Sequence, residues 1–153
     1  GMNAEFADDS QWEKVIFISP QANKTILAEL KQKAPKLVDK VILPKKVSAR
    51  GKTVTAVFAK KDLGVAVGKA GWQVLSASNE GYPKGKDVLS RKVNEFEGEH
   101  RFGGGDDGEV DPHFVDVLAG KAKGGDDEKA AQAAMLKYDA KAKTKAQLRM
   151  VRQ

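Results

Sequence analysis

The side chains best suited to acid–base chemistry in this chain are its two histidines, because histidine alone has an unperturbed pKa near neutrality. His100 lies beside Arg101, and His113 follows Pro112. With a neighbouring arginine or lysine, such histidines could cleave RNA without a metal or a thiol. No fixed spacing connects the two, so we assign no catalytic residue and keep a small histidine-dependent ribonuclease as one alternative function.

A glycine-rich segment at 64–71, GVAVGKAG, invites comparison with nucleotide-binding loops. A P-loop has four residues between its first glycine and the Gly-Lys pair, followed by a Ser or Thr that holds magnesium. Here only three residues separate Gly64 from Gly68, and Ala70 takes the place of the hydroxyl residue. The glycine spacing also differs from the dinucleotide-binding fingerprint. We therefore interpret the segment as a glycine-bent strand and assign no cofactor and no cofactor-binding residue.

An acidic stretch, FGGGDDGEVD, resembles a calcium loop in one respect only. Asp107, Glu109 and Asp111 alternate along the chain, as the first ligands of an EF-hand do. Pro112 stands where the EF-hand has its invariant glycine, and Leu118 stands where it has its bidentate acid. We therefore assign no metal ligand, and the binding of a divalent cation by this loop is left open.

The strongest charge signal is the stretch 31–61, which holds ten Lys or Arg and one acid, a net charge of +9. Its densest part, KKVSARGK, is interpreted as an exposed basic loop between two strands. Basic side chains on such a loop can contact the phosphates of nucleic acid, and the basic C-terminal segment can add contacts. The candidate nucleic-acid-binding residues are Lys45, Lys46, Arg50, Lys52, Lys141, Lys145 and Arg149.

The remaining charge alternates in sign along the chain. Residues 1–30 carry −3, residues 62–128 carry −6 and residues 129–153 carry +6. Such blocks either create a basic face for a polyanion or neutralise each other in the fold. Within the basic stretch only Phe58 could stack on a base, and it alternates with Val54 as a core residue would. A solvated lysine-rich surface is therefore the alternative interpretation.

The length and composition indicate one soluble domain with a modest core, since the chain has 153 residues, of which 41% are hydrophobic and 31% charged. The absence of cysteine excludes disulfides and thiolate metal sites. No apolar run approaches the roughly 20 residues of a membrane span. The amino terminus is acidic and unlike a basic leader. We therefore expect a cytoplasmic protein that has no membrane partner.

The spacing of apolar residues predicts the strands and helices that must position these side chains. A continuous apolar run predicts a strand over 14–19, and a helix should begin at Pro20, where a fixed φ suits the first turn. Pro35 removes one helical hydrogen bond, so this helix should end or kink near Lys33 or Ala34, with another turn after the proline. Further strands are expected over 41–43, 53–59 and 72–76, and further helices over 86–96, 112–120 and about 126–149.

This order of elements predicts an α+β fold, with a mostly antiparallel sheet of about four strands, helices packed on one face and a long basic C-terminal helix. The first strand and the strand at 41–43 could form one parallel pair. Residues 1–102 are expected to form the α+β core domain. Residues 103–153 are expected to form a Gly/Asp-rich loop plus a C-terminal helical extension that is loosely attached.

Three functions are consistent with these patterns. The leading hypothesis is a small, non-enzymatic, basic intracellular protein that binds nucleic acid through the 45–52 loop and the basic C-terminal helix. A second hypothesis is a structural or assembly protein, for example a subunit of a phage-like particle, whose partner would be another protein. The third is the histidine-dependent ribonuclease. Because no catalytic motif is present, the chain is interpreted as a non-enzyme.

Overall fold

The computed structural model describes residues 3–77, 110–120 and 128–152. The α-helices in these ranges are α1 (Asn23–Lys33), α2 (Lys60–Leu63) and α3 (Glu128–Met135), and short 3₁₀ turns cover Asp8–Ser10, Pro35–Lys40 and Val67–Lys69. The strands are β1 (Ala4–Phe6), β2 (Val15–Ile16), β3 (Val41–Ile42), β4 (Lys46–Arg50), β5 (Thr53–Val57), β6 (Gly71–Trp72), β7 (Leu75–Ser76), β8 (Asp116–Val117), β9 (Ala146–Leu148) and β10 (Val151–Arg152).

The described strands form separate pairs rather than one sheet. Two pairs are parallel, β1 with β9 and β2 with β3, and three are antiparallel, β4 with β5, β6 with β10 and β7 with β8. The predicted α+β fold with a mostly antiparallel sheet of about four strands is therefore wrong. An apolar run predicts that a segment is extended but not which segment it pairs with, and pairing between sequence neighbours is only a tendency.

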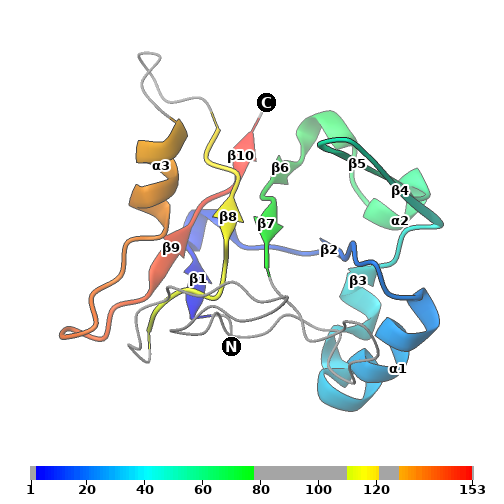
Figure 1. Ribbon diagram of the computed structural model, residues 1–153, viewed down its shortest axis with the longest axis horizontal. Helices are drawn as coiled ribbons and strands as arrows, with labels where there is room; N and C mark the ends of the chain where they lie inside the picture. The colour runs from blue at the N-terminus through cyan, green and yellow to red at the C-terminus, as the bar shows by residue number, and fades with distance from the viewer. Residues whose placement is uncertain (1–2, 78–109, 121–127, 153) are drawn as a thin grey trace.

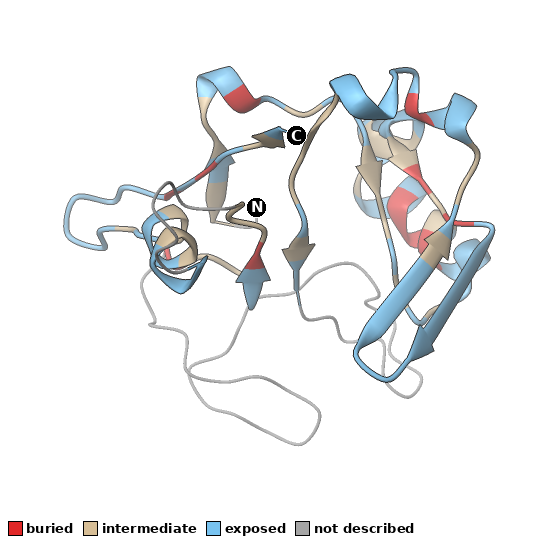
Figure 2. Cartoon of the chain, turned by 90° about the horizontal axis from the view of Figure 1, so that it is seen from above, coloured by how far each residue is buried: buried red, intermediate tan, exposed pale blue. Residues whose placement is uncertain are grey.

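The elements fall into two groups that lie side by side (Figures 1 and 2). We call the group of β2, α1, β3, β4, β5 and α2 the helical unit, and the group of β1, β6 to β10 and α3 the terminal unit. The helical unit is built from neighbouring stretches of chain, whereas the terminal unit brings β1 beside β9 and β6 beside β10. The boundary predicted after residue 102 falls outside the described residues and stays a prediction.

Each unit contains buried apolar side chains. On α1, Ile26 and Leu30 are one turn apart and therefore share a face. On β9, Ala146 and Leu148 alternate with the exposed Gln147, which is the pattern of a strand with one covered face. The buried apolar residues are Ile26, Leu30, Ile42 and Leu63 in the helical unit, and Val110, Val117, Ala146 and Leu148 in the terminal unit or next to it.

The helical unit keeps the order strand, helix, strand that the sequence predicts. The helix ends at Lys33, directly before the Pro35–Lys40 turn, as the proline requires. It begins at Asn23, three residues later than predicted. The parallel pair between the first strand and residues 41–43 is present as β2 with β3, in the register Val15 to Val41.

The long basic C-terminal helix over about 126–149 is wrong, because α3 ends at Met135. Asp139 and Thr144 exchange two backbone hydrogen bonds of 3.0 Å, which close a turn. The Asp139 carboxylate also accepts the backbone N–H groups of Lys141 and Ala142. This side chain offers the backbone an alternative to the helix, and pairing with β1 then supplies partners for β9. Tertiary pairing therefore outweighs helix propensity here.

Other predicted elements differ in extent or lie outside the described residues. The strand predicted over 72–76 is divided into β6 and β7 by two residues, Gln73 and Val74. The helix predicted over 112–120 is absent, and its centre forms β8 instead. The helix predicted over 86–96 falls outside the described ranges.

The division between β6 and β7 allows Gln73 to connect three segments of the terminal unit. Its Nε2 group donates to the carbonyl oxygens of Leu118 at 2.9 Å and Arg149 at 2.7 Å. Its Oε1 atom accepts the backbone N–H groups of Leu118 and Val74, both at 2.9 Å. One amide side chain thus satisfies backbone groups on β6–β7, on the segment after β8 and on the β9–β10 connection.

Gln73→Ala is expected to lower the free energy of unfolding by about 1 to 2 kcal/mol, because it removes four hydrogen bonds to the backbone, including the one that the part-buried Leu118 carbonyl oxygen accepts. The matched control is Gln147→Ala, since Gln147 is exposed on β9 and belongs to the same unit. Urea denaturation followed by far-UV circular dichroism measures both variants. Equal stability of the two variants would show that water replaces the contacts of Gln73 without cost.

Candidate binding surface

The exposed hairpin of β4 and β5 is the most distinctive surface of the helical unit, and we call it the ribbon. Arg50 pairs with Thr53, so only Gly51 and Lys52 form the turn. Gly51 has a φ of +58°, which glycine adopts without strain. The expected 45–52 loop is therefore wrong, because most of it is strand β4. The alternation of Val47 and Ala49 with polar neighbours has the period of a strand.

The two faces of the ribbon differ in chemistry. Lys46, Ser48 and Arg50 lie on one face, opposite Val57, Thr55 and Thr53 respectively. Val47, Ala49, Val54 and Ala56 lie on the other face. Every ribbon residue except Ala56 is exposed, and Figure 2 shows both strands almost entirely in the exposed colour. The ribbon is therefore held by its own pairing more than by burial.

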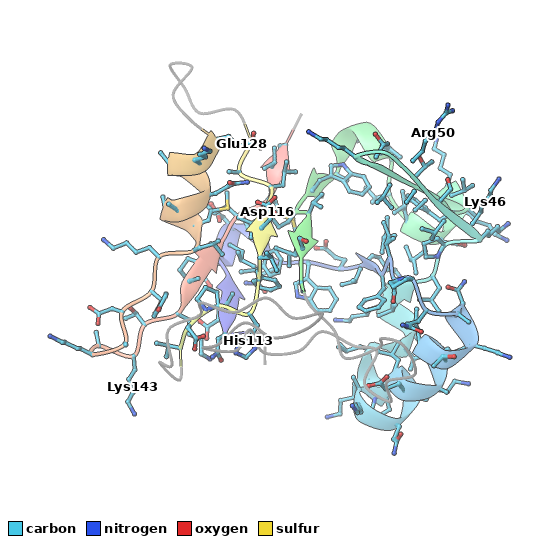
Figure 3. All side chains as sticks on the ribbon, in the orientation of Figure 1. Lys46, Arg50, His113, Asp116, Glu128 and Lys143 are labelled. Atoms are coloured by element: carbon cyan, nitrogen blue, oxygen red, sulfur yellow. The ribbon has the colours of Figure 1, made fainter. Side chains whose placement is uncertain are left out.

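The cations on the ribbon are open to solvent. Lys45, Lys46, Arg50 and Lys52 are all exposed. Among the residues that the structure describes, no carboxylate forms an ion pair with any of these four side chains. In Figure 3 the side chains of Lys46 and Arg50 extend away from the ribbon into solvent. Their charge is therefore available to a ligand.

The three predicted C-terminal cations belong to the terminal unit. Lys145 Nζ lies 3.3 Å from Glu5 Oε1, and the Arg149 guanidinium lies 3.0 Å from Asp9 Oδ2. Lys141 lies in the turn that Asp139 closes. Figure 3 labels Lys143, from the same turn, on the opposite side of the molecule from the ribbon. The structure therefore does not bring the seven predicted residues to one surface.

The predicted acid–base residues do not form a described site. His113 is half-buried, and its Nε2 atom lies 3.3 Å from the Asn3 amide nitrogen. His100 lies outside the described residues. Within the described ranges, no three His, Asp or Glu side chains come together in a group that could hold a metal ion. The question of a cation in the acidic loop concerns residues 103–111, of which the structure describes only Val110 and Asp111, both buried.

Two hollows open to solvent lie in the helical unit. One, of about 350 Å³, is lined by Ser19 to Asn23 at the start of α1 and by Pro44 to Ala49 on the approach to β4 and along it. The Asn23 amide donates to the Pro44 carbonyl oxygen at 2.7 Å and holds these two walls together. The other, of about 330 Å³, is lined by Lys14, Asp39, Val41, Ile42, Leu43 and Asp62. Both are surface depressions and do not enclose a ligand.

Aromatic side chains contribute little to the described surface. All seven described aromatic residues are at least half-buried, and none is classed as exposed. Trp12 is further covered by Lys40, whose Nζ atom lies 5.3 Å from the ring centroid, a cation–π contact. The described surface therefore offers no exposed aromatic ring on which a ligand could stack.

The open and shallow character of this surface is typical of a binding module rather than of an enclosed active site. A family model described as the "C-terminal binding-module, SLH-like, of glucodextranase" matches residues 1–151. Because this match spans almost the whole chain, the chain belongs to that family of binding modules. Searches of curated proteins and of solved structures each found no match.

This membership corrects the functional hypotheses drawn from charge and histidine content. Nucleic-acid binding, a subunit of a phage-like particle and a histidine-dependent ribonuclease are all contradicted, because the family is one of binding modules associated with glucodextranase. Lysines and arginines indicate attraction for anions but do not identify the anion. No described helix is both long and apolar enough to cross a bilayer.

Proposed function

We propose that this chain binds a polysaccharide of the cell surface. The observation that carries the proposal is the family match over residues 1–151, whose description joins a binding module to glucodextranase. The description as a binding module applies to residues 1–151, which is almost the whole chain. A polysaccharide is the partner that fits both a binding module and an enzyme whose name denotes action on a glucan.

The geometry of the ribbon supports an extended ligand. The hydroxyl groups of Ser48, Thr53 and Thr55 lie on one exposed face and can both donate to and accept from sugar hydroxyls. A strand keeps such groups in a row, so successive sugar units can be contacted in turn. The hollow beside the ribbon is open rather than enclosed, which suits a chain that continues past the site.

The experiment that tests this function is co-sedimentation of the purified chain with insoluble polysaccharides and with isolated cell-wall material. We expect a saturable bound fraction on at least one polysaccharide, and none after the protein has been heat-denatured. Isothermal titration calorimetry with the soluble form of the same polymer then gives the affinity. Failure to bind any polysaccharide or any cell-wall fraction would contradict the proposal.

A further inference from the structure

We propose that the polysaccharide carries negative charges and that it binds along the polar face of the ribbon. This inference rests on the proposed function and adds two statements to it: the chemical class of the ligand and the location of the site. The observations that carry it are the spacing of the ribbon cations, the absence of described carboxylate partners and the arrangement of the hydroxyl groups between the cations.

The spacing of the cations indicates a repeating ligand. Lys46 and Arg50 lie on the same face of β4, four residues apart. At roughly 3.3 Å per residue, their Cα atoms are roughly 13 Å apart. To contact one phosphate or carboxylate group together, the two side chains would have to bend toward each other along the strand, whereas Figure 3 shows both extending away from the ribbon. A polymer with charges on successive units can contact both side chains as they stand. The site therefore fits a polyanion better than a small anion.

The residues between these cations indicate a sugar polymer. Ser48 lies midway between Lys46 and Arg50 and is paired with Thr55, while Arg50 is paired with Thr53. The polar face therefore alternates cations with hydroxyl groups. Hydroxyl groups can donate and accept, which matches the hydroxyls of a sugar ring, and the cations match oxyanions attached to the same chain.

Two further lysines lie at the ends of the ribbon and add to its positive charge. Lys45 precedes β4, where its backbone N–H donates to the Val57 carbonyl oxygen at 2.7 Å, and Lys52 lies in the hairpin turn. No described acidic residue is paired with either lysine. A neutral glucan can accept hydrogen bonds from these four cations but has no charge for them to attract, whereas an anionic polysaccharide gains charge attraction from each of them.

The same cations also have a structural explanation that the experiment must separate from binding. In the described chain, no third strand pairs with the outer edge of β4 or β5. Charged side chains on an exposed edge prevent pairing with a second molecule. If this were their whole role, removing the charges would promote self-association and would leave polysaccharide binding unchanged.

The test compares the double variant Lys46→Gln/Arg50→Gln with the control Lys137→Gln/Lys141→Gln, which removes the same charge from the terminal unit. All four side chains are exposed, so both variants should fold. The ligands are polygalacturonate, which carries carboxylates, phosphorylated dextran, which carries phosphates, neutral dextran and duplex DNA. Affinities are measured by titration calorimetry at two salt concentrations, and size is measured by light scattering.

We expect the wild-type chain to bind at least one anionic polymer more tightly than dextran, with an affinity that falls as salt screens the contacts. The ribbon variant should bind that polymer at least about tenfold more weakly, while the control variant stays within about threefold, because only the ribbon cations meet the ligand. The anionic polymer bound more tightly identifies the charged group as carboxylate or phosphate.

Several results would overturn the inference. Equal binding of dextran and the anionic polymers, without salt dependence, would contradict the charged ligand but leave the proposed function standing. An unaffected ribbon variant, with or without larger particles in light scattering, would place the site elsewhere. Tighter binding of duplex DNA than of any polysaccharide would also contradict the ligand class. Failure of every polysaccharide, charged or neutral, would instead overturn the proposed function itself.

Discussion

Leu148→Ala is expected to lower the free energy of unfolding by about 3 to 5 kcal/mol, because it removes a fully buried side chain and leaves a cavity. Leu148 is only 1% exposed and lies on β9, next to the fully buried Ala146. The β9 strand pairs with β1 in parallel, and Phe6 is opposite Leu148. A cavity at this position therefore loosens the contact between the two ends of the described chain.

Urea denaturation followed by circular dichroism and by tryptophan fluorescence measures the effect. The control is Val74→Ala, because Val74 is 62% exposed and its truncation should change the free energy of unfolding by about 0.5 kcal/mol or less. If Leu148→Ala were as stable as Val74→Ala, the terminal unit would not contain the packed core that its burial indicates.

Two features of the helical unit, the end of α1 and strand β5, could be predicted because each has a strong local cause. Pro35 ends the first helix in the way that its ring and missing N–H require, and α1 stops at Lys33. The alternation along residues 53–59 predicts a strand, and β5 covers 53–57 of that range. These features depend on neighbouring residues in the sequence, so no knowledge of distant contacts is needed.

The pairing of the strands could not be predicted in the same way. Val151 and Trp72 are opposite one another in β10 and β6, although 79 positions separate them in the sequence. The residues that form β9 have a helical composition, and only the partner strand and the Asp139 turn make them extended. A single sequence reveals propensity and period, whereas these contacts are tertiary.

Charge alone predicted that the segment 45–52 is exposed, but it did not predict that most of this segment is a strand. The cations at 45–52 are exposed and have no described acidic partner, as a projecting basic segment requires. The strand in KVSAR was missed because its lysine and arginine suggested a loop, although Val47 and Ala49 already showed the period of two. Charge alone does not distinguish between possible partners, because nucleic acids and anionic polysaccharides present similar oxyanions.

Ile26→Ala is expected to lower the free energy of unfolding by about 2 to 4 kcal/mol, since it truncates a buried side chain in the core of the helical unit. Ile26 is 1% exposed and shares its face of α1 with Leu30, which is 4% exposed. Asn23, at the start of the same helix, donates a hydrogen bond of 2.7 Å from its side-chain amide to the Pro44 carbonyl oxygen. Pro44 precedes the ribbon in the sequence, so this bond connects α1 to the ribbon. Loss of α1 packing therefore weakens the support of the proposed binding face.

The matched control for this variant is Ile18→Ala, which removes the same atoms from a side chain that is 49% exposed. Its free energy of unfolding should change by about 1 kcal/mol or less, because a half-exposed side chain leaves no closed cavity. Chemical denaturation of both variants gives the comparison. Equal losses in Ile26→Ala and Ile18→Ala would mean that α1 is not packed through the face that carries Ile26, and the ribbon would then need another support.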